Sequence, residues 1–249
     1  MEFDISYIWQ YLPKIFERLP YTAGVIVESA AVSFLLALPI LFVRLKKIPV
    51  LSQLFEILLS FVRSMPGVLE LFLIYFGMPR LFKAFGIDIG DWSGRTFVII
   101  AMVFHYAPFL SEVLRPAYLS IENGQLEAAD AIGMTPFQKT IRIAFPQMME
   151  IAIPQLGNCL TDLIKDTSLL FTIGVIDLMG KAKLVLNNNY GRYKLETYLA
   201  VAVCYWILCG LGILLIRGLE RYYDCDGKKT VIAEKGVRNE NQLDNRNSA

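Results

Sequence analysis

Residues 198–216 read YLAVAVCYWILCGLGILLI, nineteen residues without a charged side chain. A helix rises about 1.5 Å per residue, so such a run can cross the roughly 30 Å hydrocarbon core of a lipid bilayer. Residues 21–43 and 96–114 form two further apolar runs, each interrupted by a single charge, at Glu28 and at Glu112. Soluble domains rarely contain three such runs. The chain is therefore predicted to be an all-α integral membrane protein.

The apolar pattern predicts about five transmembrane helices, of which the second and fourth contain charges and prolines. The expected spans are residues 21–43, 54–77, 96–115, 148–174 and 198–217. Residues 1–20 mix aromatic and charged side chains, which favours an interfacial segment at the membrane surface over a poorly ordered leader. The polar stretch 221–249 is expected to form a cytoplasmic tail, which leaves residues 21–220 as one transmembrane domain.

The distribution of basic residues predicts the orientation of the chain. Five spans place the two termini on opposite sides of the membrane. Lys and Arg are more frequent in residues 44–53, in residues 115–147 and in the C-terminal tail than in the other connections. Basic connections tend to face the cytoplasm. The C-terminus is therefore expected in the cytoplasm and the N-terminus outside.

The connection between the third and fourth expected spans, residues 116–147, is long enough to carry a function or a structure of its own. Residues 125–132 are rich in alanine and predict a helix, which Gly133 can end in a left-handed conformation. A second helix is expected over residues 136–145, ending before Pro146. Local chemistry thus predicts a helical hairpin exposed to the cytoplasm.

The start of the second helix has a specific signature. Thr135 can cap it, Pro136 occupies the first helical position, and Gln138 stands three residues after the cap. This is a capping-box arrangement with the proline where its missing N–H matters least. The hairpin is either a docking element or a structural connector without a partner.

The same loop carries a longer pattern with fixed spacing. Its members are Glu127, Ala128, Ala129, Gly133, Ile143, Phe145 and Pro146. The pattern resembles the EAA loop of ABC importer permeases, with Phe145 in place of the family's Leu. The resemblance implies a coupling helix that docks into a groove on a cytoplasmic ATPase subunit, with Glu127, Ala128, Ala129, Gly133 and Pro146 as coupling residues.

Other segments are similar to the polar amino-acid branch of these permeases. Residues 61–66, followed by residues 71–77, resemble the arginine–glycine–threonine–proline segment of this branch, although Ser64 and Met65 replace its Gly and Thr and Glu70 replaces its usual Gln. The resemblance covers roughly residues 20–220 and implies the type I ABC importer permease fold.

The resemblance also implies an assembly and an activity. The chain would pair with a second permease, identical or a sister chain, and with two ATPase subunits and an extracytoplasmic binding protein in a bacterial plasma membrane. It would import a polar amino acid by alternating access, with cystine or a related sulfur amino acid as the favoured substrate. The chain contains no phosphate-binding Gly-x-x-x-x-Gly-Lys-Ser/Thr loop. It is therefore expected not to be an enzyme and to bind no cofactor, with ATP and magnesium on the partner ATPase.

Charges inside the expected spans are candidates for a substrate path, because an unpaired charge in the bilayer is unfavourable by several kcal/mol. Glu56, Arg63 and Glu70 are spaced by seven residues, which predicts one shared helical face. Arg63 suits a substrate carboxylate, and Glu70 or Glu28 suits an ammonium group. The alternative is that these groups only tie the spans together.

Two further charges, Lys165 and Asp166, lie in the fourth expected span and are also candidates, although a structural role is favoured for them. Lys165 can pair with Asp162 one turn earlier. The prolines and glycines Pro66, Gly67, Pro154 and Gly157 are expected to interrupt their spans, either along a translocation path or for packing alone.

Two other functions compete with the importer. An ion-coupled secondary transporter would suit the charges in the spans, but it would leave the hairpin without a purpose. A lipid-modifying membrane enzyme would need a catalytic cluster, and the single histidine, His105, is expected to be a packing residue. The four cysteines do not have the spacing of metal ligands, so no metal site is expected.

Overall fold

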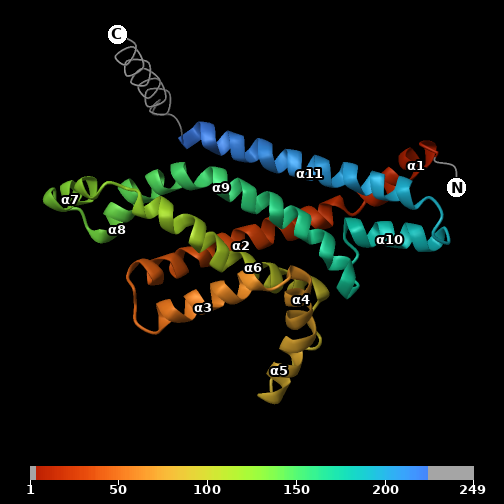
Figure 1. Ribbon diagram of the computed structural model, residues 1–249, viewed down its shortest axis with the longest axis horizontal. Coiled ribbons are helices and arrows are strands. Elements are labelled where there is room, and N and C mark those ends of the chain that lie inside the picture. Colours follow the sequence, from red (N-terminus) through yellow and green to blue (C-terminus); the bar gives the residue numbers. More distant parts are fainter. Residues whose placement is uncertain (1–3, 224–249) are drawn as a thin grey trace, which may run out of the picture.

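Residues 4–223 are described by a computed structural model in which every regular element is a helix (Figure 1). Of the predicted tail, residues 221–249, only the first three residues are described, and the part beyond Tyr223 lies outside the described residues. The α-helices are α1 (Ser6–Phe16), α2 (Leu19–Leu45), α3 (Leu51–Ser64), α4 (Gly67–Phe72), α5 (Met78–Ala84), α6 (Gly94–Leu119), α7 (Asn123–Ala131), α8 (Pro136–Lys139), α9 (Phe145–Asp166), α10 (Leu178–Asn188) and α11 (Lys194–Tyr223). Two π-helical segments, Leu73–Gly77 and Thr140–Ala144, and a 3₁₀ segment, Thr167–Ile173, continue α4, α8 and α9.

Four long helices form the body of the bundle, with α2 against α6, α6 against α9, and α9 against α11. Helix α3 returns beside α2 and α6, and the α4–α5 arm points away from the body (Figure 1). Helix α1 packs against α10 and α11 and buries Tyr11 and Ile15, so this part of the N-terminal segment is a packed helix. The all-α membrane fold is thereby confirmed.

Three of these helices, α2, α6 and α11, are long and apolar enough to cross a membrane. Helix α9 has the length of a span, at 22 residues, but it is more polar. The second expected span is broken, because α3 and the α4–α5 helix meet at an angle of 115°. Residues preceding a proline avoid the helical region, and Met65, before Pro66, is extended.

This break corrects the prediction that Glu56, Arg63 and Glu70 share one helical face. Glu56 and Arg63 lie on α3, whereas Glu70 lies on α4 beyond the bend. A seven-residue spacing places side chains on one face only within a continuous helix, and these three side chains belong to two differently directed helices.

Two other predicted interruptions are wrong. The second hairpin helix does not end before Pro146 but continues through the π-helical segment Thr140–Ala144 into α9. The wider π turn accommodates the proline ring near the carbonyl of Arg142, four residues earlier. Helix α9 also runs without a break through Pro154 and Gly157.

Gly157 has a packing role instead, because it is where α9 approaches α11 closely. A Cβ atom at this position would lie 2.8 Å from Cγ2 and 3.2 Å from Cγ1 of Ile216. The β-branched Ile216 has little freedom to move away. A side chain at position 157 would therefore push the two helices apart.

Gly157→Ala is accordingly expected to lower the melting temperature of the detergent-solubilised protein by several degrees. Gly210→Ala on α11 is the matched control, because nothing lies within 4 Å of the added Cβ. Both changes bring the same gain in helix propensity, about 0.5–1 kcal/mol. Equal melting temperatures for the two variants would show that the contact with Ile216 relaxes easily.

Candidate functional site

The hairpin of α7 and α8 is built as the sequence predicts. Gly133 adopts the left-handed conformation, with φ of +79°, and the Met134 N–H donates to the Ala129 carbonyl to close α7. Thr135 and Gln138 form the complete capping box at the start of α8. The Lys139 ammonium lies 2.7 Å from both carboxylate oxygens of Asp130, which ties α8 to α7. The hairpin therefore has a defined shape.

The surface of the hairpin combines apolar and acidic groups. Ala129 is buried, whereas Glu127 and Ala128 are exposed. Ile132 and Phe137 are 74% and 73% exposed. Large apolar side chains gathered on an exposed tip are typical of an interaction surface. Sequence reasoning missed Ile132 and Phe137, although apolar residues in an otherwise polar loop were a usable signal.

A second group of polar side chains lies inside the bundle, where α4, α6 and α9 meet. Glu70 is 2% exposed, and its Oε2 lies 2.8 Å from Nδ1 of His105. The Tyr106 hydroxyl donates to Asp166 Oδ2 at 2.7 Å. The other carboxylate oxygen of Glu70 is buried without a partner among the described residues. A buried carboxylate oxygen without a partner is unfavourable, and this makes Glu70 a candidate for contact with a ligand or water.

Two hollows adjoin this polar cluster, which consists of Glu70, His105, Tyr106 and Asp166. A hollow of about 280 Å³ lies beside His105, Tyr106 and Asp166 and is also lined by Asp162 and Lys165. A much smaller cavity, about 20 Å³, lies between Glu70, His105 and Asp166. The structure thus brings the sequence candidates Glu70, Lys165 and Asp166 into one region, together with His105.

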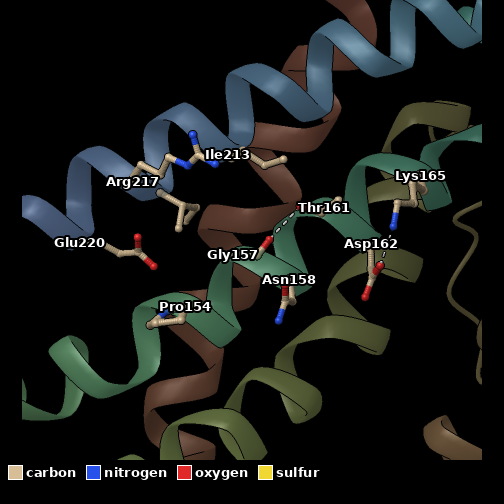
Figure 2. A pocket seen from close by; sticks show the side chains of 10 residues that line it. Pro154, Gly157, Asn158, Thr161, Asp162, Lys165, Ile213, Arg217 and Glu220 are labelled. Atoms are coloured by element: carbon tan, nitrogen blue, oxygen red, sulfur yellow. Dashed lines mark hydrogen bonds and ion pairs between the residues drawn. The ribbon is translucent and has the colours of Figure 1, made fainter. Parts of the chain in front are cut away.

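A larger groove of about 430 Å³ runs between α9 and α11 (Figure 2). Asn158, Asp162 and Lys165 approach it from α9, and Arg217 and Glu220 approach it from α11. Lys165 pairs with Asp162 at 3.2 Å, as the sequence spacing predicts. Because Asp162 and Lys165 line both this groove and the hollow beside His105, polar side chains continue along one flank of α9.

The other two candidates lie outside these hollows. Arg63 is exposed near the end of α3 and makes no hydrogen bond or ion pair with the described residues. The Glu28 carboxylate receives two hydrogen bonds from Arg95, at 2.5 and 3.1 Å. This pair ties α2 to α6, so Glu28 already has a cationic partner.

A second ion pair joins α2 to α6, nearer the hairpin. Arg44 is 7% exposed and donates to Glu112 at 2.5 Å and to Ser111 at 3.3 Å. The sequence pattern placed Arg44 in a connection rather than in the packed bundle. Helix α6 leads directly into α7, so the pair fixes the helix that carries the hairpin.

Arg44→Gln is expected to destabilise the protein, but by less than the roughly 3–5 kcal/mol typical of a fully buried pair, because the Glu112 side chain left behind is 37% exposed. The double change Arg44→Gln with Glu112→Gln should recover much of the loss, since no lone charge remains. Thermal unfolding of the four proteins in detergent measures this coupling. Additive losses in the double variant would contradict a direct interaction.

Hydrogen bonds at the opposite end hold α10 in place. The buried Asp177 accepts from the Gly180 N–H at 2.8 Å and from the Tyr205 hydroxyl at 3.1 Å. Burial raises the pKa of the Asp177 carboxyl, and the hydrogen bond from Gly180 opposes that rise. The Leu178 N–H donates to Thr22, so α10 is fixed to α2 and α11.

Among residues 4–223, no group of three or more His, Cys, Asp or Glu side chains is arranged to hold a metal ion.

The sequence profile of the family described as binding-protein-dependent transport system inner membrane component matches residues 29–223. The chain belongs to this family. This permease is 37% identical over 217 residues to the probable amino-acid permease protein YxeN of Bacillus subtilis, covering 86% of this chain and 94% of that one. It is 31% identical over 219 residues to the L-cystine transport system permease protein TcyL of the same organism, covering 88% and 91%.

Solved structures show the same fold. An amino acid ABC transporter crystallised with histidines aligns with a TM-score of 0.74 at 23% identity, covering 89% of this chain and all of that one. The MetNI methionine ABC transporter aligns with a TM-score of 0.67 at 19% identity, covering 84% and 95%. The type I ABC importer permease fold is thereby confirmed.

Together the relatives identify this chain as a membrane permease of an amino-acid ABC importer, of the polar amino-acid type. The related proteins are transport permeases rather than enzymes, and a permease of this class works with ATPase subunits. The competing interpretation, an ion-coupled secondary transporter, is not favoured.

Proposed function

We propose that this permease carries a polar amino acid into the cytoplasm by alternating access, driven by ATP hydrolysis on partner subunits. One observation carries the proposal: a rigid hairpin with an exposed apolar and acidic surface stands at one end of a bundle that contains buried polar side chains. The hairpin can transmit a movement of a partner subunit to the bundle, and the buried polar side chains can contact a polar solute. A conformational change must link the two.

The proposed assembly contains two permeases, identical or sister chains, two ATPase subunits that bind ATP and magnesium, and an extracytoplasmic binding protein. The α7–α8 hairpin docks on an ATPase, with Glu127 presented to the partner's donors and with Ile132 and Phe137 filling apolar hollows. The hairpin and the C-terminus then face the cytoplasm, and the N-terminus lies outside. Gly133 shapes the hairpin for this contact, and Pro146 lies beyond the hairpin at the start of α9, where it begins the connection to the bundle.

We place the substrate path beside the polar cluster. Glu70 is the favoured partner for the substrate ammonium group, because one of its oxygens has no partner and Glu28 is already bound to Arg95. Arg63 lies outside these hollows, on the other side of the α3–α4 break, so we propose that its guanidinium, exposed and unpaired among the described residues, meets the substrate carboxylate at a different point of the path from Glu70. Lys165 and Asp166 line the hollow between α6 and α9 and guide the polar solute past them.

Cystine or a related sulfur amino acid is the proposed substrate, supported by the similarity to TcyL. The test is uptake of radiolabelled cystine into proteoliposomes that contain the complete importer with its binding protein. Unlabelled cystine is expected to compete at least tenfold better than glutamine or histidine. Equal competition by glutamine would replace the sulfur amino acid with a different polar substrate and leave the importer mechanism in place.

A further inference from the structure

We propose that a groove between α2, α3 and α6 binds one anionic phospholipid, with an acyl chain in the groove and the phosphate beside Lys46 and Lys47. The groove has a volume of about 420 Å³, and all of the side chains that line it are apolar. Helix α2 contributes Val32 and Leu36, α3 contributes Leu58, and α6 contributes Val103 and Phe104. It is separate from the polar cluster and from the groove between α9 and α11.

The depth of the groove matches the hydrocarbon region. Val32 is the central residue of α2, and Phe104 lies near the middle of α6, and both helices are long and apolar enough to cross the membrane. An all-apolar groove at this depth offers no partner to an amino acid's carboxylate or ammonium group. A lipid acyl chain carries no polar atom, so it can enter the groove without leaving a polar group unpaired.

The end of the groove supplies the complementary charge. The α2–α3 connection joins two of the groove's walls and carries Lys46 and Lys47, both exposed. Neither ammonium group makes an ion pair with the described residues, although Lys46 lies over the Phe42 ring at 6.0 Å. Arg44 is already bound to Glu112, so Lys46 and Lys47 are the cations that the α2–α3 connection offers to a phosphate. A chain in the groove would have its headgroup close to them, since Leu36 lies about 15 Å along the helix from Lys46.

The test is native mass spectrometry of the complete importer, reconstituted with either phosphatidylglycerol or phosphatidylcholine and then transferred to detergent. We expect one phosphatidylglycerol retained per permease chain and at least fivefold less phosphatidylcholine. Leu36→Trp fills the groove and should abolish retention. Leu35→Trp is the matched control, because the neighbouring Leu35 is 65% exposed and does not line the groove.

The headgroup is tested separately. The double variant Lys46→Gln with Lys47→Gln should lower phosphatidylglycerol retention about tenfold or more, since each basic side chain near an anionic lipid surface contributes roughly fivefold. Arg80→Gln with Lys83→Gln on α5 removes the same charge elsewhere and should have no effect. Equal retention in Leu36→Trp and Leu35→Trp would overturn the proposal. Separation of the two permeases by Leu36→Trp, with no lipid retained in the wild type, would overturn it in favour of a second permease in the groove.

Discussion

Phe137→Ser is expected to remove most of the ATPase subunit that co-purifies with the permease, while the permease itself stays folded. The Phe137 side chain is 73% exposed at the start of α8, so it contributes little to the bundle's own core. Burying a phenylalanine at a protein contact stabilises it by about 2 kcal/mol, which corresponds to roughly a 30-fold change in affinity. Serine keeps the helix start, because Thr135 and Gln138 still form the capping box.

Phe85→Ser is the matched control for this experiment. Phe85 is 77% exposed just after α5, on the arm that points away from the bundle body (Figure 1). The two variants lose the same apolar area from equally exposed positions. Each would be purified from the membrane by a tag on the permease, and the bound ATPase would be quantified. Equal loss of ATPase in both variants would exclude a specific role for the hairpin tip.

The second large effect is expected at Glu70. Glu70→Gln keeps the size of the side chain and its hydrogen bond to His105 but removes the negative charge. If the carboxylate meets the substrate's ammonium group, losing a charged hydrogen bond of about 1.5–3 kcal/mol should lower uptake roughly 10- to 100-fold. The rate of substrate uptake at low substrate concentration is the direct measurement.

A purely structural role of Glu70 predicts a different result. Glutamine can still pair with His105, so a structural Glu70→Gln variant would retain nearly normal uptake. Glu56→Gln on α3 removes the same charge from an exposed position and should leave uptake unchanged. Co-purification of the ATPase should be normal in both variants, which separates substrate contact from assembly.

Much of this architecture follows from local chemistry. The long runs of α2, α6 and α11 were evident, and the hairpin's turn at Gly133 and its capping box were predicted residue by residue. Each of these features is determined by residues that are close together in the sequence, so hydropathy and helix-capping rules are enough to predict it. The break at Pro66 was expected for the same reason, but its 115° angle was not, because packing against α6 sets the direction in which the chain continues.

Features that depend on distant residues could not be predicted. The pairs of Arg44 with Glu112 and of Glu28 with Arg95 join residues 68 and 67 positions apart, and no local pattern specifies which helices cross. The contact of Glu70 with His105 likewise required the fold, although each residue was singled out from the sequence. Pro146 is the opposite case: the chain stays helical across it, through the π-helical segment that precedes it, so the fold overrides a local stop signal.

The central claim is that the hairpin couples ATP hydrolysis to amino-acid uptake through this permease. The most direct measurement is uptake of the labelled amino acid by proteoliposomes that contain the complete importer, with ATP supplied and ion gradients collapsed. The account predicts ATP-dependent uptake that Glu127→Arg abolishes and Glu56→Arg does not. Uptake that requires a sodium or proton gradient and persists without ATP, or equal uptake by the two variants, would contradict it.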